Sequence, residues 1–128
     1  FISVRDRDKN EVGDLAKNLL SLGFELVATK GTAEIIRKEG HSVQVVNKVA
    51  EGRPHIVDMI KSDSIDMIIN STEGREAIRD SGTIRSSAEQ RGIYCTTTIA
   101  GGNAACEALR FKGDIKVRSL QKLHSEIT

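Results

Sequence analysis

The sequence is poor in aromatic residues and has almost no net charge. Only 3% of its 128 residues are Phe, Trp or Tyr, with no Trp and one Tyr. Base stacking on a long nucleic acid therefore has few side chains available. The formal net charge is +1, which also argues against nucleic acid, because a DNA or RNA footprint requires a clustered basic excess.

Cysteine and long hydrophobic runs are also scarce. Cys95 and Cys106 are the two cysteines, and neither belongs to a CxxC pair, so we expect reduced thiols rather than a disulfide framework. No apolar run approaches transmembrane length and no leader pattern opens the chain, which predicts a cytoplasmic location. The chain starts with Phe1 in a strand-like segment. We expect residues 1–128 to be one domain cut from a longer polypeptide.

Short apolar strands alternate with amphipathic helices along the whole chain. We expect strands at 1–4, 24–28, 42–46, 66–70 and 93–97. The expected helices lie between residues 8 and 23, then at 32–40, 54–62, 71–92, 101–111 and 119–127. Right-handed crossovers between such strands predict an α/β fold, with a five-stranded parallel sheet inside a three-layer αβα arrangement.

Local patterns predict several helix boundaries. Asp8, three residues before Glu11, is typical of a capping box, and Gly23 supplies a stop. The next helix is expected to begin near Thr32 and to end at Gly40. Segment 71–92 is one or two helices, with a break expected at Ser81–Gly82.

Polar residues follow the predicted strands at their carboxyl ends, where open parallel sheets bind ligands. These residues are mostly hydroxyls, amides and lysines: Ser3, Lys9, Thr29, Lys30, Gly31, Thr32, Asn47, Lys48, Asn70, Ser71, Thr72 and 96–98. The amino ends carry ordinary turn residues. This asymmetry predicts a ligand site at the carboxyl edge of the sheet.

The residue types favour a phosphorylated ligand. Backbone N–H groups at a helix start attract anions, and Gly31 would let the backbone approach closely. Thr29 and Thr32 offer hydroxyls, and Lys9 and Lys48 offer charge. For one threonine alone, the better explanation is a helix cap or a strand end. For all five strand ends together, we favour a ligand site.

Catalytic groups are scarce at this edge, where Glu73 is the one obvious carboxylate. The three histidines, at 41, 55 and 124, show no metal-ligand spacing with each other or with the cysteines. Cys95 and Cys106 fit buried small apolar groups better than nucleophiles. The sequence therefore predicts a binding domain with no catalytic residue and no metal site.

Several segments resemble the C-terminal allosteric domain of the bacterial carbamoyl-phosphate synthase large chain. They are "SVRDRDK", "GFELVATKGTAEII", "VNKVAEGRPHIVDMI", "IINSTEGREAIRDSGTIRSSA" and "TTIAGGNAACEAL". The resemblance covers almost the whole chain and implies the methylglyoxal-synthase-like (MGS-like) fold, which is Rossmann-like. It also implies a nucleotide monophosphate effector, UMP or IMP. The implied effector-binding residues are Lys9, Thr29, Thr32, Lys48, Asn70 and Thr72, with Ser3 and Gly31 as weaker candidates.

The resemblance also implies a parent enzyme. That ligase makes carbamoyl phosphate from bicarbonate, glutamine or ammonia, and two ATP with Mg or Mn, for arginine and pyrimidine biosynthesis. The implied partners are its synthetase domains and the glutaminase small chain, with oligomerisation of the parent. The domain itself is expected to be non-catalytic and to hold no cofactor. We expect no nucleic-acid or membrane partner.

One departure and two alternatives accompany this resemblance. Enteric members use a Tyr-Asp-Thr run to help hold ornithine, whereas Cys95, Thr96 and Thr97 stand here. The first alternative function is a methylglyoxal synthase acting on dihydroxyacetone phosphate, although the aspartates of that family are replaced here. The second is a structural or oligomerisation module.

Overall fold

The sheet has five parallel strands, as predicted. In the computed structural model, which describes residues 1–47, 55–71 and 75–112, the strands are short. They are β1 (Ile2–Ser3), β2 (Val27–Ala28), β3 (Gln44–Val45), β4 (Met67–Asn70) and β5 (Tyr94–Thr96). Their order is β3-β2-β1-β4-β5, and each neighbouring pair is parallel. The segment 42–46, predicted as a strand, supplies β3 at one edge.

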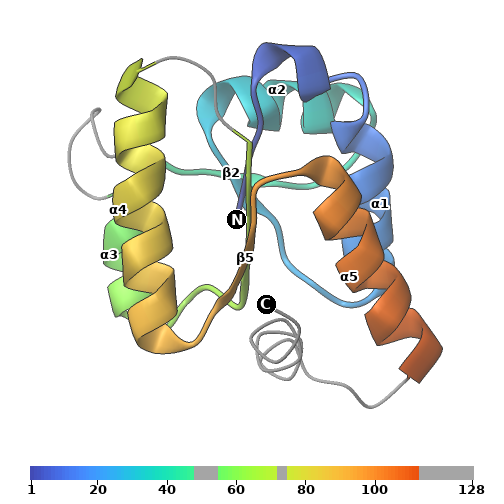
Figure 1. The fold of residues 1–128 in the computed structure, drawn as a ribbon. Helices are drawn as coiled ribbons and strands as arrows, with labels where there is room; N and C mark the ends of the chain where they lie inside the picture. The colour runs from blue at the N-terminus through green and yellow to red at the C-terminus, as the bar shows by residue number, and fades with distance from the viewer. Residues whose placement is uncertain (48–54, 72–74, 113–128) are drawn as a thin grey trace.

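Helices cover both faces of the sheet, which confirms the three-layer αβα arrangement. A 3-10 turn, η1 (Asp6–Asp8), follows β1. The α-helices are α1 (Val12–Ser21), α2 (Lys30–Lys38), α3 (Ile56–Lys61), α4 (Arg75–Arg91) and α5 (Ile99–Lys112). Figure 1 shows α3 and α4 on one side of the sheet and α1 and α5 on the other. The predicted helix at 119–127 lies outside the described residues, within which no helix is both long and apolar enough to cross a membrane.

Strand β4 supplies side chains to the hydrophobic core on both faces. All four of its residues are buried. Because successive side chains of a strand point to opposite faces, Ile69 packs in the cluster with Leu15 of α1 and Ile36 of α2. Its neighbour Ile68 packs in the second cluster, with residues of α3 and α4. This two-sided burial explains the continuous apolar run at 67–69.

Glycines end the two helices that precede β2 and β3, as predicted. Gly23 has φ +94° and Gly40 has φ +87°, a backbone region that favours glycine. In each case the residue after the glycine donates a backbone hydrogen bond to the last turn of the helix. Phe24 N bonds Leu19 O at 3.2 Å, and His41 N bonds Ile36 O at 3.2 Å. Both ends are Schellman motifs.

The predicted capping box of Asp8 and Glu11 is wrong. Glu11 occupies the N-cap position of α1, and its side chain makes no capping hydrogen bond. Residues 6–8 instead form a 3-10 turn, closed by Asp8 N bonding Arg5 O at 3.0 Å. That turn directs the Asp8 carboxylate to Arg5, whose Nε donates to it at 2.8 Å.

Two helix boundaries also differ from the prediction. Helix α2 begins at Lys30 rather than near Thr32, because Thr29 is the last extended residue (φ −67°, ψ 159°) and its carbonyl accepts from Ala33 N. Helix α4 runs without a break through 81–82. A glycine inside a helix costs only about 1 kcal/mol, and the buried Ile84 and Ala88 anchor α4 on the sheet.

Candidate functional site

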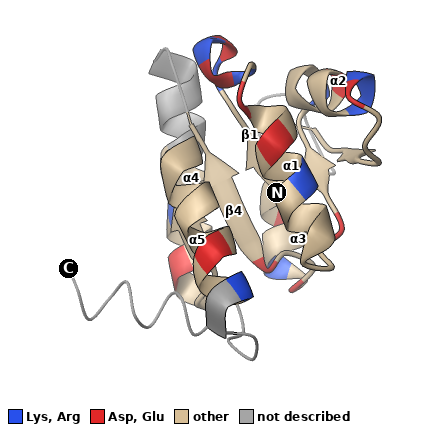
Figure 2. Ribbon diagram, turned by 90° about the vertical axis from the view of Figure 1, so that its right-hand side faces the viewer, with Lys and Arg blue, Asp and Glu red and all other residues tan. Residues whose placement is uncertain are grey.

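The carboxyl ends of β1, β2 and β4 meet at the reversal point of the strand order. The chain adds β2 and β3 on one side of β1 and then crosses over to add β4 and β5 on the other. Open α/β sheets bind ligands at such a reversal. The register pairs Ser3 with Asn70, and Ile2 with Ala28. Thr29 therefore follows β2 directly beside the end of β1. Figure 2 shows charged residues of both signs on the turn that follows β1 at this edge.

The buried polar residues of the described chain all gather at this edge. They are Thr29 (3% exposed), Thr32 (1%), Asn70 (4%) and Ser71 (5%). Buried polar groups cost free energy unless they are hydrogen-bonded. A set of four in one place therefore indicates a built polar site rather than scattered core positions. Asn70 and Thr29, both predicted from the strand ends, are among them.

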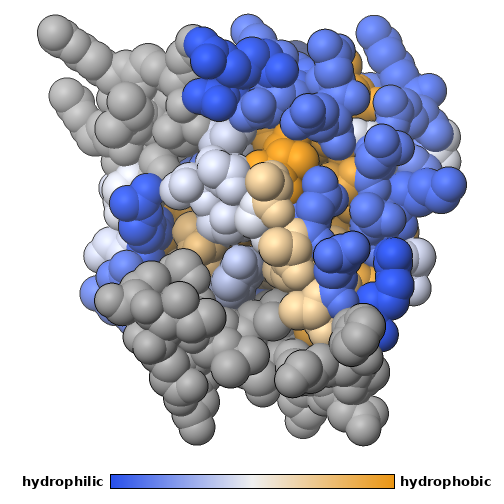
Figure 3. Space-filling model, turned by 45° about the vertical axis from the view of Figure 1, so that its right-hand side comes forward, coloured by the Kyte–Doolittle hydropathy of each residue, from blue (hydrophilic) through white to orange (hydrophobic). Residues whose placement is uncertain are grey.

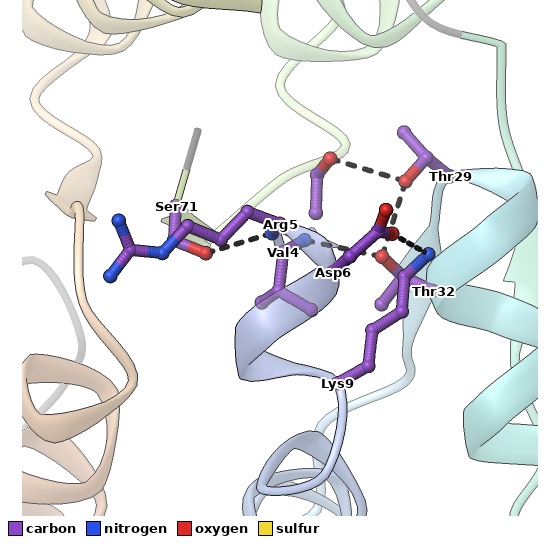
Figure 4. Close-up of polar contacts among 8 residues, drawn as sticks. Val4, Arg5, Asp6, Lys9, Thr29, Thr32 and Ser71 are labelled. Carbon is purple, nitrogen blue, oxygen red and sulfur yellow. Dashed lines mark hydrogen bonds and ion pairs between the residues drawn. The ribbon is translucent and has the colours of Figure 1, made fainter. Parts of the chain in front are cut away.

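Three hydroxyls form a connected group at the start of α2 (Figure 4). Thr29 Oγ1 lies 3.1 Å from Ser3 Oγ and 3.4 Å from Thr32 Oγ1. Because a hydroxyl carries one hydrogen, Thr29 can donate to only one of them at a time. Thr32 Oγ1 also accepts from Val4 N at 3.1 Å, so Thr32 is not a helix cap. The group joins β1, β2 and α2.

Lys9 reaches the same place from the end of η1. A Cβ added to Gly31 would stand 3.1 Å from Lys9 Nζ, so the ammonium lies directly against the glycine in the first turn of α2. Asp6 Oδ1 accepts from this ammonium at 2.7 Å. Gly31 and Lys9 are therefore neighbours: because Gly31 has no side chain, the ammonium of Lys9 has room beside the first turn of α2.

A second polar contact joins β1 to β4. Arg5 N donates to Ser71 Oγ at 3.1 Å, and Arg5 Nε pairs with Asp8. Burial disfavours the charged form of Asp8, but hydrogen bonds from Ser71 and Arg5 outweigh this effect and lower its pKa. The positive charges of Arg5 and Arg7 act in the same direction.

The sequence did not indicate that two carboxylates, those of Asp6 and Asp8, would lie at this edge. Glu73, expected to be the one obvious carboxylate at this edge, lies outside the described residues, and Asp6 and Asp8 stand at the edge instead. The alternating charges of segment 5–9 were visible in the sequence. Their placement depends on the 3-10 turn, which no periodicity indicated.

Six of the eight predicted site residues are described, and the structure brings them to one edge. They are Ser3, Lys9, Thr29, Gly31, Thr32 and Asn70. The other two, Lys48 and Thr72, lie outside the described residues. Each directly follows a described residue, Asn47 and Ser71 respectively. In the space-filling view, hydrophilic side chains line the upper part of the molecule, where η1 and α2 lie in Figure 1 (Figure 3).

The end of β5 carries hydroxyls that organise the start of α5. Thr98 Oγ1 accepts from Gly101 N at 2.9 Å, as an N-cap residue does.

The two cysteines lie in β5 and α5. Cys95 is part-buried and Cys106 is buried, and burial raises the pKa of both thiols. Among the side chains that the structure describes, no three of His, Cys, Asp or Glu are grouped as metal ligands.

The strand order and the polar carboxyl edge define the class of the protein, a doubly wound parallel α/β domain of the Rossmann-like kind. A family model described as "MGS-like domain" matches residues 11–97. The chain therefore belongs to the MGS-like domain family, as its sequence motifs predicted.

Curated relatives carry the name carbamoyl phosphate synthase large chain. That of Pseudomonas putida is 59% identical over 125 residues, covering 98% of this chain and 12% of the relative. That of Pseudomonas aeruginosa is 58% identical over 127 residues, covering 99% of this chain and 12% of the relative. That of Halomonas eurihalina is 52% identical over 128 residues, with shares of 100% and 12%. The chain thus spans 12% of the length of these relatives.

Proposed function

We propose that this chain is the allosteric domain of a carbamoyl-phosphate synthase large chain and that its carboxyl edge binds a nucleoside monophosphate, UMP or IMP. The parent would be a cytoplasmic ligase of arginine and pyrimidine biosynthesis, using bicarbonate, glutamine or ammonia, and two ATP with Mg or Mn. Its partners would be the synthetase domains and the glutaminase small chain. The sequence identity to relatives of that name supports this assignment.

The observation that carries the proposal is the convergence of hydroxyls and a lysine on the start of α2. Thr29, Thr32 and Ser3 lie within one hydrogen-bonded group, and Lys9 lies against Gly31. Phosphate requires donors of this kind: hydroxyls, a point charge and the backbone N–H groups at a helix start. The buried amide of Asn70 stands next to this group across β1 and suits the ribose or the base. Lys48 and Thr72 would complete the site from the two adjoining segments.

The site suits binding better than catalysis of methylglyoxal formation. Such a lyase needs a carboxylate whose pKa permits proton transfer near neutral pH. Asp8 has a lowered pKa and is paired with Arg5, and Asp6 is paired with Lys9. Both carboxylates are therefore engaged with cations. We expect no phosphate release when the chain is assayed with dihydroxyacetone phosphate.

Calorimetric titration tests the proposal. We expect UMP or IMP to bind and uridine to bind far more weakly. Ornithine is titrated beside them, because the chain lacks the Tyr and Asp of the enteric run. Lys48→Ala should weaken nucleotide binding by at least about 1 kcal/mol, as for a lost charge-assisted hydrogen bond. Lys61→Ala is the matched control, because Lys61 is exposed at the far end of α3. Equal nucleotide affinities of the Lys48→Ala variant and the unaltered chain would remove Lys48 from the site.

Regulation would follow from differential affinity. An effector shifts a conformational equilibrium only as far as it binds one state better than the other. UMP would therefore favour the low-activity state of the parent, and IMP the active state. A structural module predicts instead that no nucleotide raises the melting temperature, whereas a binder must stabilise the folded chain by mass action.

A further inference from the structure

The ammonium of Lys9 is paired with the carboxylate of Asp6. Asp6 Oδ1 lies 2.7 Å from Lys9 Nζ, three residues apart across η1 (Figure 4). The two side chains differ in environment: that of Asp6 is 92% exposed, and that of Lys9 only 27%. The lysine is therefore held by the protein, whereas the aspartate extends into solvent beside it.

We propose that Asp6 competes with the phosphate of the bound nucleotide for Lys9 and so sets the effector affinity lower than the site could give. This inference rests on the proposed function. A phosphate oxygen bonded to the same nitrogen would stand within about 6 Å of the Asp6 carboxylate, the sum of two hydrogen-bond lengths. Two negative charges at that separation repel each other appreciably even in water.

The opposite effect, in which Asp6 helps by positioning Lys9, is the smaller of the two. Exposed ion pairs three residues apart contribute little, because two flexible side chains must be ordered to form them. Lys9 is also held in place by packing, since its ammonium fits the space beside Gly31, which has no side chain. Removing the Asp6 charge therefore leaves the lysine in place and takes away the repulsion.

Asp8 is a carboxylate of the same turn with a different role. It is engaged by Arg5 Nε at 2.8 Å and by Ser71, and its side chain is only 17% exposed. It positions Arg5 between β1 and β4, whereas Asp6 meets the predicted phosphate contact itself. The inference applies to Asp6 alone.

The test is calorimetric titration of Asp6→Asn with UMP and with IMP. Asparagine keeps the size of the side chain and removes its charge. We expect the nucleotide to bind about three- to tenfold more tightly, which is the repulsion between Asp6 and a phosphate of one or two negative charges at about 6 Å. Asp66→Asn is the matched control: Asp66 is exposed just before β4, at the opposite edge of the sheet. The nucleotide affinity of the Asp66→Asn variant should equal that of the unaltered chain. Without nucleotide, the melting temperature of the Asp6→Asn variant should equal that of the unaltered chain.

The outcomes separate the two proposals. If the unaltered chain and both variants bind neither nucleotide, the proposed function is overturned. If the unaltered chain binds and Asp6→Asn binds equally or more weakly, only the competition is overturned. A double-mutant cycle tests the mechanism, because Lys9 is what holds the phosphate beside Asp6. In a Lys9→Met background the phosphate is no longer held there, and the gain from Asp6→Asn should fall below about twofold. A gain of the same size in that background would contradict competition for Lys9.

Discussion

The backbone amide of Val4 donates a hydrogen bond of 3.1 Å to the side-chain oxygen of Thr32. This contact ties the end of β1 to the first turn of α2 across 28 residues of sequence. It also fixes the wall of the proposed phosphate site, because Thr32 is 1% exposed and touches Thr29. The same side chain therefore serves both the fold and the site.

Thr32→Val should destabilise the fold by about 1–3 kcal/mol, because it leaves the buried N–H of Val4 without its acceptor. Thr29→Val is the matched control. Thr29 is as buried, but its side-chain hydrogen bonds run to other hydroxyls, so the loss of its hydroxyl should cost less. Urea unfolding of both variants measures the difference. Equal losses would show that the Val4 contact contributes nothing special.

Gly102→Ala should destabilise by about 1–2 kcal/mol, because overpacking costs about 1–3 kcal/mol and alanine inside a helix returns about 0.5–1 kcal/mol. A Cβ at this position would stand 3.1 Å from Ile69 Cδ1 and 3.2 Å from Leu15 Cδ1, both in the packed core between α5, β4 and α1. Gly82→Ala provides the contrast. Gly82 lies inside α4, and beyond its chain neighbours and its own helix backbone no atom lies within 4 Å of the new Cβ, so Gly82→Ala should stabilise by about 0.5–1 kcal/mol. Thermal unfolding of the pair checks both signs.

Asp8→Asn should lower stability in a pH-dependent way. The folded state lowers the pKa of Asp8 below its ordinary value of 3.8, so its contribution is present above that value and is lost as the pH falls through the folded pKa. We expect a loss of about 0.5–1 kcal/mol near neutral pH. That loss should shrink toward zero as the pH falls through the lowered pKa of Asp8 in the folded state. Urea titrations across this range measure it, and a constant difference at every pH would contradict the account.

Both thiols should react slowly with iodoacetamide at neutral pH. The thiolate is the reactive species, and burial raises the pKa of Cys95 and of Cys106. Cys106 should be the slower, because it is 2% exposed whereas Cys95 is part-buried. Mass spectrometry of the native and the urea-unfolded chain gives both rates. Rapid labelling of native Cys106 would show that the helix face carrying it is not packed as described.

The layers and the edge of the sheet could be predicted because they follow from periodicity. Val12, Leu15 and Leu19 recur at helical spacing, and all three are buried in α1. The segment at 42–46 was predicted as a strand and forms β3, which lies at one edge of the sheet. Polar residues after successive strands predicted the site, because parallel strands end at the same edge.

The remaining details depend on local backbone geometry that residue types alone do not determine. Asp8 and Glu11 have capping-box spacing, but the 3-10 turn places Asp8 against Arg5 instead. The hydroxyl of Thr32 suited a helix cap, but the extended backbone of Thr29 starts the helix earlier. The pairing of Asp6 with Lys9 follows from that same 3-10 turn and so escaped prediction.

Amide chemical-shift mapping of the isotope-labelled chain with UMP tests the central claim most directly. The account predicts the largest saturable shifts at the carboxyl edge, in the amides of Ser3 to Lys9, Thr29 to Thr32, and Asn70 to Ser71. Amides at the amino edge, such as those of Gly23 and Asp66, should shift little. Largest shifts at that amino edge, or no saturable shift at any nucleotide concentration, would contradict the account.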